Sequence, residues 1–89
     1  MDVTILLGSS SDLPVAQKCT KILEQFDVPY QLRVASAHRS PKFVEQIVGD
    51  AIDDGCSVFI AMAGLAAALP GAVAALTTKP VIGVPCGGR

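Results

Sequence analysis

The chain has 89 residues, of which 51% are hydrophobic, and a formal net charge of −1, which suits one domain with one core. Its seven Lys and Arg residues are scattered, whereas a nucleic-acid-binding surface needs a basic cluster. The longest apolar run, residues 58–76, divides into a predicted strand, a loop and a helix with Pro70 near its start, so we expect no single helix that spans a bilayer, and no signal peptide is recognisable. We therefore expect neither a nucleic-acid partner nor a membrane partner, and a cytoplasmic location.

The three cysteines are Cys19, Cys56 and Cys86, an odd number with wide spacing. The chain has one histidine and no C-x-x-C motif, so neither a zinc site nor a disulfide framework is indicated. Reduced thiols, as in cytosolic proteins, are the simplest interpretation.

The first predicted element is a strand over Val3–Leu7, a run that is apolar except for Thr4 and is typical of a strand buried on both faces. The serine-rich segment Gly8–Asp12 follows. A helix is predicted to begin there, with Ser11 or Asp12 as its N-cap and Pro14 in its first turn. Its apolar stripe has helical spacing and comprises Val15, Cys19, Ile22, Leu23 and Phe26.

The second predicted strand, Tyr30–Val34, alternates apolar and polar residues, as a half-buried strand does. A second helix is predicted to begin after Ser40 as N-cap, with Pro41 at its first position. His38 and Arg39 therefore fall in a short loop between a strand end and a helix N-terminus. The helix stripe comprises Phe43, Val44, Ile47, Val48, Ala51 and Ile52, and Gly55 ends the helix.

The remainder repeats the pattern. A third strand is predicted over Ser57–Ala61, then an Ala-rich helix with Pro70 near its start that runs to about Leu76, and a fourth strand over Val81–Val84. Strands alternating with helices predict an α/β fold, a three-layer flavodoxin-like (Rossmann-like) parallel sheet of order 2-1-3-4. Three helices are few for two sheet faces, so we expect residues 1–89 to form a single α/β domain that is incomplete at its C-terminus.

In such a sheet the loops after all four strands meet at one edge, where open α/β sheets bind ligands. Serines and glycines in these loops supply hydroxyls and N–H groups that suit a phosphate. Arg39 offers a fork for phosphate or carboxylate, Asp12 can hold a sugar hydroxyl, and His38 can move a proton near neutral pH. Taken singly, each feature has an ordinary alternative: a helix cap, a turn or a solvated charge.

Four segments, in order, closely resemble the carboxyaminoimidazole ribonucleotide mutase family of purine biosynthesis, which includes the aminoimidazole ribonucleotide carboxylases. They are Gly8–Asp12, Ser36–Arg39, Ala63–Gly71 and Gly83–Pro85. The resemblance covers essentially the whole chain. It implies an enzyme that converts 5-(carboxyamino)imidazole ribonucleotide to 5-amino-4-imidazolecarboxylate ribonucleotide, without metal or organic cofactor, as a homo-octamer.

The resemblance also implies roles for individual residues. His38 corresponds to the catalytic acid–base, and Asp12 to a ligand of the ribose hydroxyls. The remaining substrate-binding residues that it implies are Ser9 and Ser11 on the phosphate side, Ser36, Ala37 and Arg39 in the second loop, and Ala63 and Gly64 around the imidazole and its carboxylate.

One position departs from many bacterial members, which have His where this chain has Ala68. This leaves open a direct CO₂-dependent aminoimidazole ribonucleotide carboxylase, although Ser36-Ala37-His38-Arg39 favours the mutase. A non-catalytic phosphosugar-binding flavodoxin-like module is the other alternative. A flavin site is not indicated, because the aromatic residues fall on helices and strands rather than in the loops.

Overall fold

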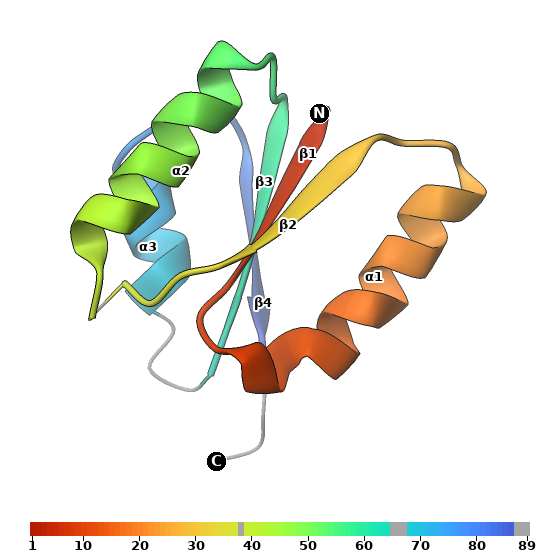
Figure 1. Ribbon diagram of the computed structural model, residues 1–89, viewed down its shortest axis with the longest axis horizontal. Helices are drawn as coiled ribbons and strands as arrows, with labels where there is room; N and C mark the ends of the chain where they lie inside the picture. The colour runs from red at the N-terminus through yellow and green to blue at the C-terminus, as the bar shows by residue number, and fades with distance from the viewer. Residues whose placement is uncertain (38, 65–67, 87–89) are drawn as a thin grey trace.

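The computed structural model describes residues 1–37, 39–64 and 68–86, in which strands and helices alternate as predicted (Figure 1). The elements are β1 (Val3–Leu7), the 3₁₀ helix η1 (Ser10–Asp12), α1 (Leu13–Gln25), β2 (Tyr30–Val34), α2 (Pro41–Asp53), β3 (Val58–Ala63), α3 (Ala68–Ala74) and β4 (Val81–Pro85). None of the helices in this described part is long and apolar enough to cross a membrane.

The four strands form one parallel sheet of order β2-β1-β3-β4, which confirms the predicted topology. β1 lies inside the sheet, paired with β2 on one side and β3 on the other, and all five of its residues are buried. Because every strand runs in the same direction, the loops that follow the strands lie at one edge of the sheet.

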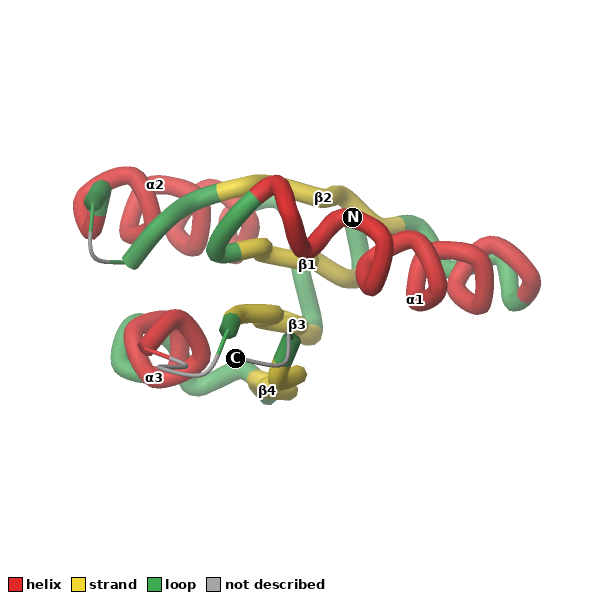
Figure 2. Tube along the Cα trace, turned by 90° about the horizontal axis from the view of Figure 1, so that it is seen from below, coloured by secondary structure: helices red, strands yellow, loops and turns green. Residues whose placement is uncertain are grey.

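The helices lie on both faces of the sheet, so the three-layer arrangement is also confirmed (Figure 2). α1 covers one face, and α2 and α3 cover the other. Under α2 and α3 the buried cluster comprises Leu6, Ala35, Val44, Ile47, Val48, Ala51, Cys56, Phe59, Ala61, Ala63, Leu69 and Val73. Under α1 it is smaller and comprises Val3, Ile5, Leu7, Ala16, Met62 and Cys86.

The starts of α1 and α2 differ from the predicted caps. Pro14 and Pro41 lie in the first turns as expected, but the side chains of Asp12 and Ser40 make no capping hydrogen bond. At α1 the inserted η1 moves the cap upstream, so that the Ser9 hydroxyl accepts a hydrogen bond from the Ser11 N–H instead. Sequence reasoning missed η1, because a single 3₁₀ turn has no apolar period of its own.

The end of α2 follows the predicted signal. Gly55, with φ of 87°, follows the C-cap residue Asp54 of α2, in the left-handed region that glycine adopts without strain. Asp27, with φ of 55°, plays the same part after α1. The expected stripe of α1 is only partly buried, because Ile22 and Phe26 are 55% and 73% exposed.

The close approach of α3 to β4 yields a prediction at Gly83. A Cβ atom there would lie 3.2 Å from Pro70 Cβ and 3.3 Å from Pro70 Cγ. Valine has a higher strand propensity than glycine, yet Gly83→Val is expected to lower the free energy of unfolding by about 1–3 kcal/mol through overpacking. Urea denaturation measures this.

Gly49 provides the matched control, because a Cβ atom there meets nothing within 4 Å. Gly49→Ala in α2 is expected to raise the free energy of unfolding by about 0.5–1 kcal/mol. A Gly83→Val protein as stable as the parent would show that α3 does not pack closely against β4 at this position.

Candidate functional site

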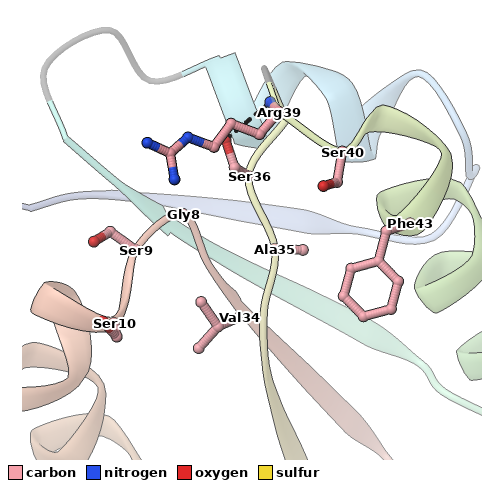
Figure 3. Close-up of a pocket in the computed structure, with 9 residues that line it drawn as sticks. All are labelled: Gly8, Ser9, Ser10, Val34, Ala35, Ser36, Arg39, Ser40 and Phe43. Atoms are coloured by element: carbon pink, nitrogen blue, oxygen red, sulfur yellow. Dashed lines mark hydrogen bonds between the residues drawn. The ribbon is translucent and has the colours of Figure 1, made fainter.

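A cavity of about 560 Å³ opens between the carboxyl ends of β1 and β2 (Figure 3). Three segments contribute its walls: the turn after β1, the end of β2 with the loop that follows it, and the first turn of α2. The lining residues are Gly8, Ser9, Ser10, Val34, Ala35, Ser36, Arg39, Ser40 and Phe43. The cavity thus brings together the first two of the four loops that the sequence analysis singled out.

The turn after β1 presents hydroxyl groups to this cavity. The Gly8 N–H donates to the Met62 carbonyl at 2.9 Å, which ties the turn to the neighbouring strand β3. Ser9 Oγ and Ser11 Oγ lie 2.9 Å apart, and Ser9 Oγ also accepts from the Ser11 N–H at 3.2 Å. Hydroxyls and N–H groups held together at a helix start suit an anion such as phosphate.

The loop after β2 holds Arg39 in a defined turn. Ser36 Oγ accepts from the Arg39 N–H at 3.2 Å, and the Ser36 carbonyl accepts from the Ser40 N–H at 2.9 Å. The Arg39 guanidinium extends toward the side of the cavity that carries Gly8 and Ser9 (Figure 3). Within the described residues no carboxylate pairs with it, so its donors are available to a bound anion.

The opposite end of the cavity is apolar. Val34 and Phe43 are 45% and 39% exposed, and the guanidinium of Arg33 lies 5.7 Å from the centroid of the Phe43 ring. Sequence reasoning missed both as lining residues, because Val34 was assigned to a strand and Phe43 to a buried helix stripe. The proximity of Phe43 to Pro41, at the helix start beside the loop, was the available signal.

The other predicted residues lie along the same edge without lining this cavity. Asp12 is buried, with 9% of its surface exposed, and Ala63 is buried at the end of β3, next to exposed Gly64. Ala37 packs against the cluster under α2 and α3. Of the predicted ligands, therefore, Ser9, Ser36 and Arg39 share the cavity, and Ser11 contacts it through Ser9.

The third and fourth loops also lie close to each other. The Cys86 N–H donates to the Ala63 carbonyl at 2.7 Å, which continues the pairing of β3 with β4 into the loop. Burial raises the pKa of the Cys86 thiol, and the negative charge of Asp12 raises that pKa further. The fourth loop thus also lies near Asp12 of the first loop.

His38, the predicted acid–base, lies outside the described residues, as do 65–67 and 87–89. Its catalytic role stays a prediction. Within the described ranges no three His, Cys, Asp or Glu side chains gather into a group that could hold a metal ion.

Comparison with known proteins shows the family to which this chain belongs. Residues 2–89 match the family model described as AIR carboxylase. The chain belongs to the AIR carboxylase family. Among its relatives, the N5-carboxyaminoimidazole ribonucleotide mutase of Methanocaldococcus jannaschii is 58% identical over 83 residues, which are 93% of this chain and 51% of the relative.

Two further relatives carry different names. The N5-carboxyaminoimidazole ribonucleotide mutase of Aliivibrio fischeri is 46% identical over all 89 residues and 55% of its own length. The phosphoribosylaminoimidazole carboxylase of Candida glabrata is 50% identical over 86 residues, which are 97% of this chain and 15% of that protein.

Solved structures agree with this assignment. The crystal structure of Treponema denticola PurE has a TM-score of 0.88 and 33% sequence identity over 97% of this chain. This chain covers 55% of that structure. It thus spans about half the length, or less, of the AIR carboxylase relatives it matches.

The geometry of the cavity predicts that Arg39 anchors a phosphate group. Arg39→Ala is expected to weaken the binding of ribose 5-phosphate by about 1.5–3 kcal/mol, the range for a hydrogen bond to a charged group. Isothermal titration calorimetry measures the difference.

Arg33→Ala is the matched control, because Arg33 lies over Phe43 and does not line the cavity. Its effect on binding is expected to stay within about 0.5 kcal/mol. If both variants lose the same affinity, the ligand is attracted only by the total positive charge near the cavity, and Arg39 is not a specific anchor.

Proposed function

We propose that this chain forms the substrate-binding crevice of an enzyme that converts 5-(carboxyamino)imidazole ribonucleotide to 5-amino-4-imidazolecarboxylate ribonucleotide in de novo purine biosynthesis. The observation that carries the proposal is the cavity in which the Arg39 guanidinium faces the Gly8–Ser9 turn. The names of the relatives from Methanocaldococcus jannaschii and Aliivibrio fischeri support the reaction.

The phosphate of the ribonucleotide would bind Arg39, Ser9 and Ser36, since these supply a charged fork and two hydroxyls around one cavity. The ribose would then reach Asp12, the buried carboxylate of the same turn. The imidazole would extend along the sheet edge toward Ala63 and Gly64, because β3 is the next strand from β1 in that direction. Small side chains there leave room for a flat ring and a carboxylate.

The reaction moves a carboxylate within one molecule. The bond between the exocyclic nitrogen and the carboxylate carbon breaks and releases CO₂, and the nitrogen gains a proton. Ring carbon C4 then attacks the CO₂, a carbon–carbon bond forms, and the C4 proton leaves. Atoms and charge balance with no oxidant, reductant or co-reactant.

One residue with a pKa near neutrality can serve both proton transfers, and His38 is the only histidine in the chain. Its neighbour Arg39 would hold the phosphate and thereby fix the distance from the imidazole to His38. A crevice that closes over the substrate would also keep the released CO₂ beside C4, and such proximity would lower the barrier of the second step.

A direct CO₂-dependent carboxylase is the second candidate. Ala68 stands where many bacterial mutases have His, and the Candida glabrata relative is named a carboxylase. Both enzymes would use the same phosphate and ribose contacts. They differ in whether the carboxylate arrives on the exocyclic nitrogen of the substrate or as free CO₂.

The proposal includes an assembly and a location. We infer a homo-octamer in the cytoplasm, as the family resemblance implies. Relatives with about twice the matched length support a complete enzyme that has further sequence beyond these elements.

A chimera tests the function. These 89 residues would replace the matching segment of the Methanocaldococcus jannaschii relative, which supplies the other half of its length. The purified chimera is expected to convert 5-(carboxyamino)imidazole ribonucleotide faster than it carboxylates aminoimidazole ribonucleotide in bicarbonate. Both rates are measured from the absorbance of the product. The reverse preference would establish the carboxylase, and a folded chimera that binds both ligands without turnover would identify a non-catalytic module.

The catalytic role predicted for His38 is tested in the same chimera. His38→Asn keeps a polar side chain of similar size but removes the imidazole, the side chain whose ordinary pKa lies near neutrality. Substrate affinity is expected to stay near normal while the turnover rate falls at least about 10²-fold, the lower end for lost acid–base catalysis. Turnover close to the parent rate would place the acid–base elsewhere in the enzyme.

A further inference from the structure

Phe43 is an aromatic residue that the core does not use. It begins the apolar stripe of α2, yet its side chain is 39% exposed, whereas Val44 and Ile47 on the same stripe are buried. Among the described residues, Phe43 belongs to neither buried cluster and is not one of the partly buried side chains packed against them. The ring therefore lies at the surface of the cavity and adds little to the packing under α2.

The neighbouring strand supports the ring from the side. The Arg33 guanidinium of β2 lies over the Phe43 ring, 5.7 Å from its centroid, where the electrons of an aromatic face attract a cation. Val34, the next residue of β2, is 45% exposed and also lines the cavity. It likewise lies outside both buried clusters of the described residues. The cavity therefore has a preformed apolar end that carries an aromatic surface.

A serine hydroxyl lies between this apolar end and the anion-binding end. Ser40 precedes α2, and its side chain makes no capping hydrogen bond, so the helix start does not engage the hydroxyl. In Figure 3 the Ser40 hydroxyl lies between the Arg39 backbone and the Phe43 ring, while the Arg39 guanidinium extends to the other side, toward Ser9. The cavity thus presents a charged fork, then a hydroxyl, then an aromatic ring.

We propose that this cavity binds a purine nucleoside monophosphate in a second orientation, with its phosphate on Arg39, its ribose beside Ser40 and its base on the Phe43 ring. The order of groups in the cavity matches the order of phosphate, sugar and base in such a nucleotide. The volume of about 560 Å³ is in the range of small-molecule sites, which combine apolar and aromatic walls with a few polar groups. A phosphate alone would leave the aromatic end without a partner.

The apolar end selects the base by its surface and not by hydrogen bonds. Neither Phe43 nor Val34 has a polar side-chain atom that could bind the edge of a base. Stacking on an aromatic ring accepts any base, but its strength grows with the area in contact, so a purine is favoured over a pyrimidine. Adenine and guanine nucleotides are expected to bind alike.

This orientation differs from the one proposed for the substrate. There the imidazole extends from the phosphate toward Ala63 and Gly64 at the end of β3, on the far side of β1 from β2. Phe43 instead lies on the β2 side, beneath Arg33. Because the phosphate contacts are those of the proposed function, on which this orientation rests, the substrate and the nucleotide exclude each other. Purine nucleotides, the end products of the proposed pathway, would thereby inhibit the enzyme competitively.

Isothermal titration calorimetry of the 89-residue chain with AMP and with ribose 5-phosphate tests the second orientation. Both ligands carry a phosphate on the same sugar, so the difference between them reports on the base. AMP is expected to bind at least about fivefold more tightly, the lower end for a base stacked on an aromatic side chain. Phe43→Ala is expected to remove this advantage and to leave the affinity for ribose 5-phosphate within about twofold of the parent value.

Two further variants make the result specific. Phe43→Tyr keeps an aromatic ring and is expected to retain the tighter binding of AMP. Phe26→Ala is the matched control, because Phe26 is an exposed phenylalanine at the end of α1 and is not among the described residues that line the cavity. It is expected to change neither affinity. Binding of ribose 5-phosphate to the same preparation shows that each variant has folded.

Equal affinities of the parent chain for AMP and ribose 5-phosphate would overturn the second orientation, because the base would then make no contact. A Phe43→Ala chain that keeps the tighter binding of AMP would overturn it as well and would place the base elsewhere, such as toward Gly64. Either result leaves the phosphate site of the proposed function intact. A parent chain that binds neither ligand would instead contradict the phosphate site on which both proposals rest.

Discussion

Parallel pairing of β1 between β2 and β3 is the constraint on which the rest of the structure depends. It places the turn after β1 beside the loop after β2 and against the end of β3, as the bond from Gly8 to Met62 shows. Residues about 30 positions apart along the chain thereby come to line one cavity. An antiparallel partner for β1 would have sent one of these loops to the opposite edge.

Within this frame the second loop depends on a local interaction. Ser36 accepts hydrogen bonds from the two N–H groups of Arg39 and Ser40, one through its side chain and one through its carbonyl. This turn fixes where the Arg39 side chain leaves the backbone before any ligand binds. Preorganisation of this kind lowers the ordering cost of binding, which supports the proposed role of Arg39 as a phosphate anchor although the chain as a whole is slightly acidic.

The fold was predictable from the sequence because each element carries its own period. Val3–Leu7 is apolar except for Thr4 and is buried throughout, and four of the six apolar positions expected on α2 are buried. The caps were less predictable. The hydroxyl of a serine and the carboxylate of an aspartate can each accept a hydrogen bond from several nearby N–H groups. Which of these bonds forms is decided by η1 before α1 and by the turn at Ser36 before α2.

The candidate site was predicted in part for a similar reason. Strand order and loop position placed Ser9, Ser36 and Arg39 at one edge, and the structure brings them into one cavity. Phe43 was not predicted as a lining residue, because helical spacing alone cannot distinguish an apolar residue in the core from one at the rim. Likewise, the spacing of Ile22 and Phe26 identified an apolar stripe without showing that the described helices leave it uncovered.

The location of the ligand is the central claim, and amide NMR of the isotopically labelled chain tests it most directly. On titration with aminoimidazole ribonucleotide, the account predicts the largest shifts in the amides of residues 8–11 and of Ser36, Arg39 and Ser40. A second cavity of about 480 Å³, lined by Ile52 and residues 75–79, lies near the C-terminal ends of α2 and α3 and provides the internal comparison. Shifts concentrated at residues 75–79, with the two loops unmoved, would contradict the account.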